Sequence, residues 1–404
     1  MKILVLNSGS SSVKFQLIEM AGRAVLARGL VERIGVPCGL LRYEAAGREA
    51  LERKMDFPDH KAAITRTLDA LTDRSIGVIP ELSSIGAVGH RMVLGGPTIR
   101  KAVRIDEAVV KLVEEYVKLA PLHNPPTLTG FRAASSLLPD VPHVGVFDTA
   151  FTAGLPATVH VYPIPYELYE NYGIRRFSYH GTSHKYVARR AAEFLGRDPS
   201  DFRCVTCHLG NGCSILAVKD GSPVDTSLGF GTVAGLMMGT RSGDVDPDIL
   251  LYMMEGLKMG VEDVRRVLYR ESGLKGVSGV SNDLRDVERA ADDGNPRARL
   301  AFDMFAHHAS RYVASTALSL EGRLDAVVFT AGMGENSSRM RTAICRRLAL
   351  LGIRLDDARN TVRGKEAVIS AEDSSVVVLV VPTNEELMIA LETEEVVVAP
   401  GAAL

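Results

Sequence analysis

Apolar runs and short polar turns alternate along the first part of the chain. ILVLN is followed by the turn SGSSS, the run VKFQLIEM, the turn AGR and the run AVLARGLVERI. Apolar runs of this length, separated by Ser- and Gly-rich turns, predict three strands in an antiparallel meander. Helical periodicity over 59–74 and 106–119 predicts two helices, and buried strands are expected over 84–93 and just before Asp148.

The second half repeats this pattern. CVTCHL, the turn GNG, the run CSILAVK and a strand after the following Asp-Gly turn form a second meander, and NSGSSSVKFQLI aligns with LGNGCSILAV. Helices are expected over 247–258, 262–270 and 297–320. The last two apolar runs, LDAVVF and SSVVVLVV, each predict a strand, a turn and a helix. The sequence therefore predicts an internal duplication of two α/β halves with its seam near 149–180. Such halves would enclose a cleft lined by the polar turns.

Composition narrows the class of protein. The 404 residues carry 47 basic and 49 acidic side chains, a net charge of −2, so the overall basic footprint of a nucleic-acid binder is absent. No uncharged apolar stretch reaches the length of a membrane span, and the N-terminal apolar run is too short for a signal peptide. A cytoplasmic enzyme is expected. The five cysteines argue against a disulfide scaffold, and Cys204 and Cys207 are interpreted as buried structural thiols.

Two turns offer phosphate-binding chemistry. The turn from Asn7 to Lys14 carries serine hydroxyls, backbone N–H groups and one lysine, which suit a phosphate, although a plain serine-rich hairpin would read the same way. It is not a Walker A loop, because the glycine spacing differs and a strand follows. The second meander places His208-Leu-Gly-Asn-Gly212 at the equivalent turn. This repeat favours a cleft in which both turns bind phosphate.

Two further segments are weaker candidates. Gly332-Met-Gly334-Glu335-Asn336 lies between a buried strand and a helix, where glycines let a ligand approach and a helix N-terminus favours anions. A tight turn explains the same residues equally well. Asn282-Asp283-Leu-Arg285 could hold a ribose or base, or could be an ordinary helix cap.

The charged candidates lie at the ends of the expected elements. Arg91 and Arg241 suit carboxylate or phosphoryl oxygens because the guanidinium grips them bidentately. His180-Gly-Thr-Ser-His184 lacks the glutamate of a zinc protease, so one histidine is expected to stabilise phosphoryl charge and the other to be structural. Asp148 remains open as a base, a metal ligand through water, or a partner that orients an arginine. Asn7 and Glu385 are oxygen donors of the kind that Mg²⁺ prefers.

Together these segments resemble the acetate kinase family. The matching motifs are ILVLNSGSSSVK, GHRMV, LHNPP, VFDTAF, RRFSYHGTSHKYV, HLGNGCS, GLMMGTRSGDVDP, FTAGMGENS and PTNEELMIA, in the family's order from residue 3 to about 392. The resemblance implies a duplicated ribonuclease H-like (actin-like ATPase) α/β fold. It implies one domain over 1–150, completed by a C-terminal helix over 385–404, and a nucleotide-binding domain over 151–384 around a nucleotide cleft.

The resemblance also implies an activity and its residues. The γ-phosphoryl group of ATP would pass reversibly to acetate, giving acetyl phosphate and ADP, with Mg²⁺ or alternatively Mn²⁺. Arg91 would bind the acyl carboxylate, His180 and Arg241 would stabilise the transition state, Asp148 matches an essential aspartate, and Asn7 and Glu385 match metal-associated positions. The nucleotide-contacting positions would be Ser10, Ser12, Lys14, His208, Leu209, Gly210, Asn211, Gly212, Asp283, Leu284, Arg285, Gly332, Met333, Gly334, Glu335 and Asn336. A homodimer is expected, with the apolar helices near 297–320 as a candidate interface.

The acyl pocket departs from the family pattern. Val93 and Leu122 keep the usual residues, but Tyr179 stands where phenylalanine is usual and Thr232 where proline is usual. Because one methylene is worth only ~1–3 kcal/mol of discrimination, propionate or another short-chain carboxylate is the first alternative substrate. A non-kinase ATP-binding protein on the same fold is the second alternative, although Arg91, His180 and Arg241 would then lack a purpose.

Overall fold

The computed structural model describes residues 1–121 and 123–398 of the chain. The backbone divides into two compact units. Unit 1 comprises Met1–Ala153 and the C-terminal segment that begins at Asn384, and unit 2 comprises Gly154–Thr383. Each unit is an α/β structure with its own sheet and its own core.

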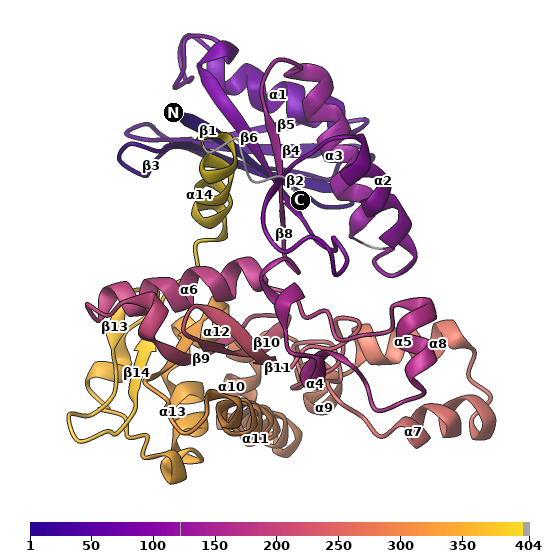
Figure 1. The fold of residues 1–404 in the computed structure, drawn as a ribbon, viewed down its shortest axis with the longest axis vertical. Helices are drawn as coiled ribbons and strands as arrows, with labels where there is room; N and C mark the ends of the chain where they lie inside the picture. Colours follow the sequence, from indigo (N-terminus) through magenta and orange to yellow (C-terminus); the bar gives the residue numbers. More distant parts are fainter. Residues whose placement is uncertain (122, 399–404) are drawn as a thin grey trace. The chain divides into compact units, whose positions relative to one another are not determined.

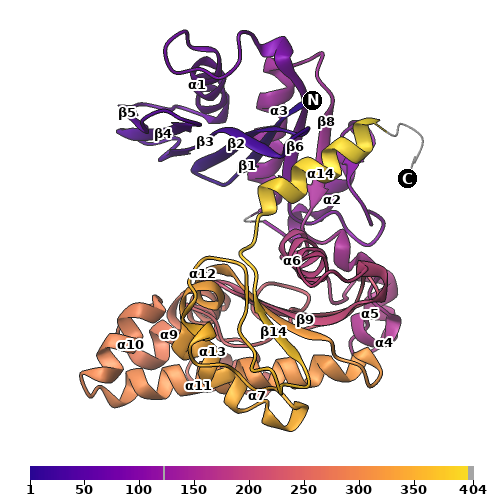
Figure 2. The ribbon, with the colours of Figure 1, turned by 90° about the vertical axis from the view of Figure 1, so that its left-hand side faces the viewer.

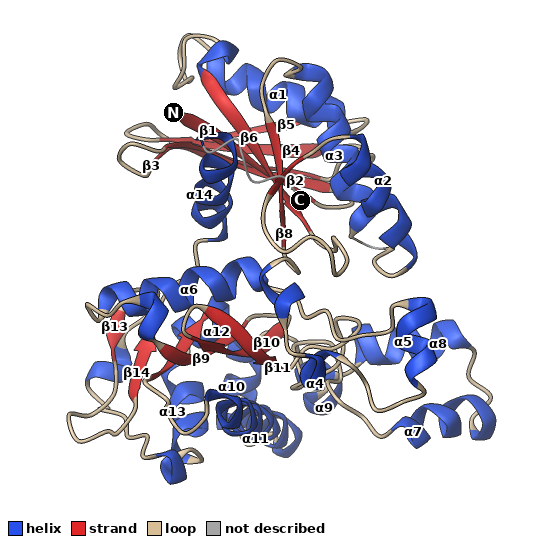
Figure 3. Ribbon diagram, in the orientation of Figure 1, coloured by secondary structure: helices blue, strands red, loops and turns tan. Residues whose placement is uncertain are grey.

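Unit 1 is built on an eight-stranded mixed sheet of order β5-β4-β3-β2-β1-β6-β8-β7 (Figure 3). The meander predicted from the first three apolar runs is confirmed, because β1 pairs with β2 and β2 with β3 in antiparallel register. β6 runs parallel to β1, and β8 runs parallel to β6. The strand bounds are β1 Lys2–Ser8, β2 Ser12–Glu19, β3 Ala24–Glu32, β4 Gly39–Ala45, β5 Leu51–Met55, β6 Ile85–Met92, β7 Val103–Arg104 and β8 His143–Phe147.

The period of two along β1 divides the core of unit 1 into two layers. Leu4 and Leu6 pack on one face against the layer that holds α1 (His60–Thr72) and α3 (Asn124–Leu137). Ile3 and Val5 pack on the other face against apolar residues of α14 (Glu385–Val398). Figure 1 shows α14 on the side of the sheet opposite α1 and α3. The last described helix of the chain therefore completes the core of the first unit.

Unit 2 has a six-stranded mixed sheet of order β11-β10-β9-β12-β14-β13. β9, β10 and β11 form the second predicted meander, while β12 runs parallel to β9 and β14 parallel to β12. Figure 2 shows α6 on one face of this sheet and α11 on the other. The strand bounds are β9 Arg203–Leu209, β10 Cys213–Lys219, β11 Ser222–Thr226, β12 Ala326–Thr330, β13 Ala367–Val368 and β14 Val377–Val380.

The two sheets confirm the internal duplication. The order β3-β2-β1-β6-β8 in unit 1 corresponds to β11-β10-β9-β12-β14 in unit 2, with the same antiparallel and parallel neighbours. The turn after β1 therefore corresponds to the turn after β9. Cys204 and Cys207 are buried in β9 and unbridged, as expected for structural thiols.

Several of the remaining helices begin directly after a side-chain cap. Asp106, Asp246, Asn295 and Ser337 each accept a hydrogen bond from a backbone N–H of the helix that they precede. The α-helices have the bounds α2 Glu107–Glu115, α4 Ala157–His160, α5 Tyr166–Tyr172, α6 Gly181–Phe194, α7 Pro247–Leu251, α8 Val261–Arg266, α9 Gly273–Ser278, α10 Leu284–Asp292, α11 Pro296–Ala317, α12 Ala331–Asn336 and α13 Ser338–Arg346. Among the described residues, no helix is long and apolar enough to cross a membrane.

Several predicted helices change form near their ends. The helix expected over 106–119 is α-helical only to Glu115 and continues as a 3₁₀ turn over Tyr116–Lys118. The two helices expected over 247–258 and 262–270 each widen into a π-helical turn, over Tyr252–Gly256 and Val267–Glu271. The glycine turn expected after β12 is instead the short helix α12, which begins at Ala331 directly after the strand.

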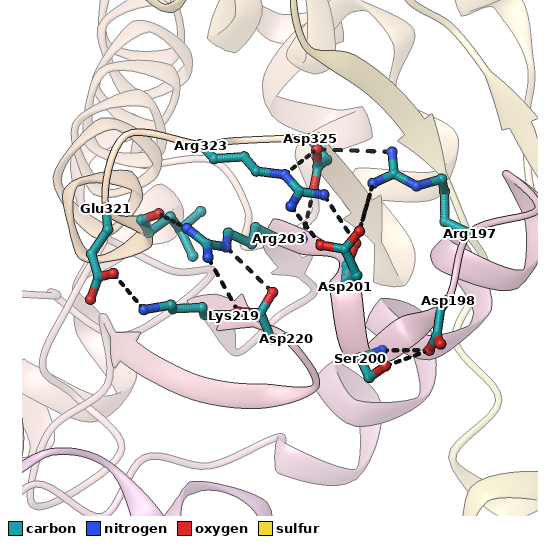
Figure 4. A network of polar contacts seen from close by, with 11 residues as sticks. Arg197, Asp198, Ser200, Asp201, Arg203, Lys219, Asp220, Glu321, Arg323 and Asp325 are labelled. Carbon is teal, nitrogen blue, oxygen red and sulfur yellow. Dashed lines mark hydrogen bonds and ion pairs between the residues drawn. The ribbon is translucent and has the colours of Figure 1, made fainter.

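A network of ion pairs ties the start of β9 to the start of β12 (Figure 4). Arg203 pairs with Asp220, and Arg323 pairs with both Asp201 and Asp325. The Arg203 backbone N–H donates to the Asp325 carboxylate at 2.9 Å. This network fixes the strand ends opposite the polar turns, so the turns project from a braced sheet.

Candidate active site

The turn between β9 and β10 brings Arg241 and His180 to a glycine. A Cβ atom placed on Gly212 would lie 3.2 Å from Arg241 Nη1 and 3.6 Å from His180 Nε2. The Gly210 N–H donates to the Gly212 carbonyl at 3.1 Å and so closes a tight turn. A cationic side chain, an imidazole and an exposed backbone loop thus meet at one place in unit 2.

Arg241 has no carboxylate partner among residues 1–121 and 123–398. Its Nη1 group donates to the Thr232 carbonyl at 3.2 Å and also contacts the sulfur of Met238. Burial lowers the pKa of Arg241 from its ordinary value. Since a partly buried cation without an ion pair is costly, an anionic ligand would stabilise this arrangement.

His180 is held at the start of α6 in a backbone conformation that non-glycine residues rarely adopt. Its φ is 59°, in the left-handed region, and it occupies the N-cap position. Nδ1 lies 2.8 Å from Ser214 Oγ, and the ring stacks on His208 with the centroids 4.3 Å apart. His208 Nδ1 in turn lies 2.8 Å from Ser183 Oγ. The strain and the ring contacts fix the direction of the His180 imidazole.

His184 lies one turn further along α6 and is fully buried. Its two ring nitrogens contact Thr206 Oγ1 at 2.6 Å and Ser214 Oγ at 2.7 Å. Burial lowers the pKa of His184 well below its ordinary value, so the ring is neutral. The expected division of roles between the two histidines agrees with this placement, since His184 is enclosed by protein on all sides.

Unit 2 also holds a cavity of about 410 Å³ beside the same turn. Gly210, Asn211, Asp283, Leu284, Arg285, Gly332, Met333 and Asn336, all predicted as nucleotide-contacting, line it. Asn282 Nδ2 donates to Asn211 Oδ1 at 3.0 Å across one wall, and the Arg285 side chain pairs with Asp283. That pairing lowers the pKa of Asp283 to about 2.

Three residues of the cavity wall escaped the sequence analysis. Glu288 accepts a hydrogen bond from Ser337 Oγ at 2.7 Å, and Arg363 Nε donates to the Asn336 carbonyl at 2.9 Å. Glu288 lies in α10, Ser337 immediately precedes α13, and Arg363 lies in a loop. No single motif contains all three residues. Only the fold brings them together.

Two predicted nucleotide-contacting residues are placed differently. Glu335 Oε1 accepts from the backbone N–H of Ala331 at 2.7 Å and of Thr383 at 3.2 Å, so its carboxylate is used in bracing the strand ends. Gly334 gives its carbonyl to Arg341, a fully buried arginine whose Nη1 also donates to the Glu335 carbonyl. Neither Gly334 nor Glu335 lines the cavity. Arg341 shares the buried face of the otherwise polar helix α13 with Ile344 and Cys345, and this spacing is the signal for its buried position.

In unit 1 the chemistry is different. Arg91, in β6, makes a two-pronged ion pair with Asp148, just after β8, with Nη2–Oδ2 at 2.6 Å and Nε–Oδ1 at 3.3 Å. Nη1 of Arg91 donates to Asn7 Oδ1 at 3.4 Å. The carboxylates of Asp148 and then Glu385 hold the pKa of Arg91 above its ordinary value. Of the three roles left open for Asp148, the ion pair favours that of orienting an arginine.

The serine turn of unit 1 is less enclosed. Lys14, in β2, forms an ion pair with Glu386 of α14, and its side chain is half exposed. Ser10 and Ser12 lie at the turn between β1 and β2 of unit 1, so the predicted nucleotide-contacting residues are divided between the two units.

Oxygen donors for a divalent cation are present in unit 1. Glu385 has no ion pair or hydrogen bond among the described residues, whereas both oxygens of Asp148 are engaged by Arg91. No group of three or more His, Cys, Asp or Glu side chains able to hold a metal occurs among the described residues. Mg²⁺ takes only one or two carboxylates together with phosphates and water, so Asn7 and Glu385 fit it.

The residues expected at the acyl pocket are only partly described. Val93 is buried after β6, and Tyr179 is buried with its hydroxyl donating to the Phe230 carbonyl at 3.2 Å. Thr232 holds Arg241 through its carbonyl. Leu122 lies outside the described residues.

Comparison with known proteins decides the family. The model of the acetokinase family matches residues 2–391. The chain belongs to the acetokinase family. It is 49% identical to the acetate kinase of Pseudothermotoga lettingae over 98% of each chain.

Two solved structures of the acetokinase family resemble the whole chain. The acetate kinase of Porphyromonas gingivalis has 45% sequence identity and a TM-score of 0.94, covering 98% of this chain and 99% of that one. The propionate kinase of Francisella tularensis has 39% identity and a TM-score of 0.90 over the same shares. The resemblance inferred from the motifs is therefore confirmed over the full length of the acetokinase fold.

Proposed function

We propose that the chain catalyses reversible transfer of the γ-phosphoryl group of ATP to acetate, giving acetyl phosphate and ADP. The observation that carries the proposal is the position of Arg241 and His180 at the glycine turn that also borders the 410 Å³ cavity. A nucleotide in that cavity, with its phosphates directed to the turn, would supply the anion that Arg241 lacks. Membership of the acetokinase family and about 50% identity to acetate kinases support the same reaction.

The reaction needs positioning more than proton transfer. Acetate is ionised far below neutral pH, so its oxygen is already a nucleophile and requires no general base. The remaining barrier is the approach of two anions and the charge that develops on the transferring group. Arg241 and His180 are the described groups of unit 2 that would stabilise this charge. In-line displacement without a covalent enzyme intermediate follows from this inventory.

In unit 1 Arg91 is the proposed ligand of the acetate carboxylate. Asp148 holds the guanidinium through two hydrogen bonds, which fixes its plane and leaves the remaining N–H edges for the substrate. The role proposed for Asp148 is therefore orientation of Arg91. An ion-paired carboxylate is a weak base, and each oxygen of Asp148 accepts from Arg91, so we assign Asp148 no general-base role.

A divalent cation is the proposed cofactor besides ATP. Asn7 and Glu385 would hold Mg²⁺, or alternatively Mn²⁺, and the cation would neutralise phosphate charge when bound. Because Glu385 has no other partner among the described residues while Asp148 is paired, we assign the direct contact to Glu385. Lys14, Ser10 and Ser12 remain proposed phosphate contacts.

Acetate is the proposed acceptor, with propionate as the alternative. The Tyr179 hydroxyl is tied to the Phe230 carbonyl, so it adds no free polar tip that would deter an apolar acyl group. Thr232, in place of the usual proline, is the departure that favours a wider pocket. The propionate kinase of Francisella tularensis shares the fold, so fold alone does not separate the two acids.

We also propose a homodimer in the cytoplasm. The face of α11 that the sequence suggested as an interface is packed inside unit 2, with Phe302, Phe305 and Val313 buried. Exposed apolar side chains gather instead on α5, α7, α8 and the turns beside them, where one subunit would cover another. They are Tyr166, Tyr172, Ile249, Leu251, Tyr252, Met254, Leu257 and Val261. Sedimentation of Leu251→Asp against Leu300→Asp, an exposed leucine on α11, would test this interface.

The experiment that tests the reaction is a hydroxamate assay with ATP, Mg²⁺ and hydroxylamine, run in parallel with acetate, propionate and butyrate. The highest kcat/KM with acetate is the expected result. A preference for propionate would keep the reaction and move the specificity to Thr232 and Tyr179. No acyl phosphate from any of the acids, in protein that binds ATP, would overturn the proposed function.

A further inference from the structure

Three side chains behind His180 form a continuous chain of hydrogen bonds. It runs from His180 Nδ1 to Ser214 Oγ at 2.8 Å, from Ser214 Oγ to His184 Nε2 at 2.7 Å, and from His184 Nδ1 to Thr206 Oγ1 at 2.6 Å. Thr206 Oγ1 ends the chain at the Leu216 carbonyl, 3.1 Å away. Ser214, His184 and Thr206 are completely buried, and the proposed reaction assigns none of them a role.

The direction of every hydrogen bond follows from the last one. A carbonyl oxygen can only accept, so the single hydroxyl proton of Thr206 goes to Leu216. Thr206 must then accept from His184, which places the proton of that ring on Nδ1. Burial keeps the pKa of His184 well below its ordinary value, so the ring holds one proton and its Nε2 accepts. Ser214 therefore donates to His184 and accepts from His180 Nδ1.

We propose that Ser214, His184 and Thr206 are positioning residues that keep a proton on His180 Nδ1 and direct His180 Nε2 to the glycine turn. Nε2 and Cε1 of the ring both lie 3.6 Å from the Cβ position of Gly212, and Arg241 Nη1 lies 3.2 Å from it. Only the expected effect on kcat rests on the proposed function. The tautomer itself is a property of the protein without substrate.

The chain decides what His180 can do for a phosphoryl group. With Nδ1 committed to Ser214, the ring becomes a donor at Nε2 only as the imidazolium, which is a charge-assisted donor and the stronger one. In the opposite tautomer a neutral Nε2–H would donate more weakly. Groups that face the ring include His208 by stacking, His184 through Ser214, and Arg241 at the turn.

Nitrogen-15 NMR of the full-length protein labelled at histidine tests the assignment. The signals of His180 are identified by their loss in His180→Asn, and spectra are taken at about pH 8, above the ordinary histidine pKa of about 6.5. We expect a protonated Nδ1 and an unprotonated Nε2 at His180. A proton on Nε2 in the unmodified protein would overturn the proposal.

Two variants and one matched control complete the test. Ser214→Ala should give mixed tautomers at His180 and lower kcat about tenfold, with the KM values for ATP and acetate within about twofold, since the lost stabilisation belongs to the transition state. Thr206→Val keeps the side-chain shape and removes the terminal donor, so the chain can reverse and the proton should move to Nε2. Ser227→Ala removes another fully buried serine, whose Oγ accepts from the Ile215 N–H at 2.8 Å, and should change neither readout.

The outcomes separate this inference from the proposed function. If Ser214→Ala matches Ser227→Ala in both tautomer and kcat, the positioning role is wrong even in an active kinase. If the unmodified protein makes no acyl phosphate, the function fails, and the NMR comparison of the three variants still decides the tautomer. Should Thr206→Val fail to fold, Ser214→Ala against Ser227→Ala is sufficient.

Discussion

The two units share a strand order but not the chemistry at their strand ends. In unit 1 the cation Arg91 is neutralised by Asp148, and two more acidic residues, Glu385 and Glu386, stand at the start of the neighbouring helix. In unit 2 the cation Arg241 has no carboxylate among the described residues and stands beside an imidazole and a glycine turn. Unit 1 thus carries a strand arginine that is paired with a carboxylate, and unit 2 carries a loop arginine that has no carboxylate partner among the described residues.

This difference matches the two tasks of the proposed reaction. A paired arginine is held rigidly, so it can orient a small carboxylate, but the carboxylate of its partner already neutralises its charge. An unpaired arginine keeps its charge for the ligand and costs stability while the ligand is absent. The presence or absence of a neighbouring carboxylate therefore decides which task each arginine can perform.

Replacement of Arg241 should have the largest effect on turnover. Arg241→Ala is expected to lower kcat by on the order of 10³-fold, the range for an arginine that stabilises a transferring phosphoryl group. The variant should be no less stable than the unmodified protein, because no ion pair is broken and a partly buried, unpaired cation is removed. Steady-state kinetics of folded protein check this, with Arg346→Ala, an exposed arginine on α13, as the control. Near-normal turnover would remove Arg241 from the site.

Replacement of Arg91 should affect stability as well as catalysis. Arg91→Ala leaves the Asp148 carboxylate buried without its partner, and loss of one member of a buried pair costs about 3–5 kcal/mol. Because a quarter of the Arg91 side chain is exposed, we expect about 3 kcal/mol from chemical denaturation, together with a raised KM for acetate. The double variant Arg91→Ala/Asp148→Asn should recover part of the stability. No loss of stability in Arg91→Ala would contradict the contrast with Arg241.

The fold was largely predictable because its pattern is local. Both meanders and the long helix α11 follow from periodicity and turn residues within short windows of sequence. Strands β4 and β5 were not predicted. β5 is an edge strand whose middle residues, Glu52 to Lys54, are exposed, so it has no apolar alternation to detect. The π-helical turns after α7 and α8 likewise have no signature in spacing.

The sequence predicted most of the residues of the site, but few of the contacts between them. Motifs gave most of the cavity wall, including Asn211, Asp283 and Gly332. Glu288 and Arg363 join that wall only through packing between elements distant in sequence. The partners of Arg91 and the chain behind His180 are also contacts across the sheet, and one sequence without relatives contains no record of such pairs.

The glycine turn allows a finer test of unit 2. In Gly212→Ala the added Cβ would lie 3.2 Å from Arg241 Nη1, which is tight enough to displace the guanidinium by a few tenths of an ångström. We expect kcat to fall about tenfold, since small misplacements of a positioning group are costly. Gly22→Ala, in an exposed turn of unit 1, is the control, because nothing lies within 4 Å of its Cβ position. Equal kcat values for the two variants would show that the turn does not crowd Arg241.

Buried histidines should make both units sensitive to acid, and this is the smallest of the four predicted effects. Burial lowers the pKa of His90 and His143 in unit 1 and of His184 in unit 2. His143 Nε2 donates to the Leu138 carbonyl, so His143 Nδ1 accepts from His90 at 2.9 Å, and both rings are neutral in the folded chain.

The unfolded chain takes up protons near pH 6.5 while these rings do not, so stability is fully present above that pH and falls as the pH drops below it. Each ring should cost about 1 kcal/mol at roughly pH 5.5 relative to pH 7.5. Hydrogen exchange at the two pH values should show β6 and β8 losing more protection than β9 and β10, because unit 1 buries the linked pair. His143→Gln should reduce this loss in unit 1, and His307→Gln, at an exposed position of α11, should leave it unchanged. Equal acid sensitivity in His143→Gln and the unmodified protein would mean that the pair does not control the stability of unit 1.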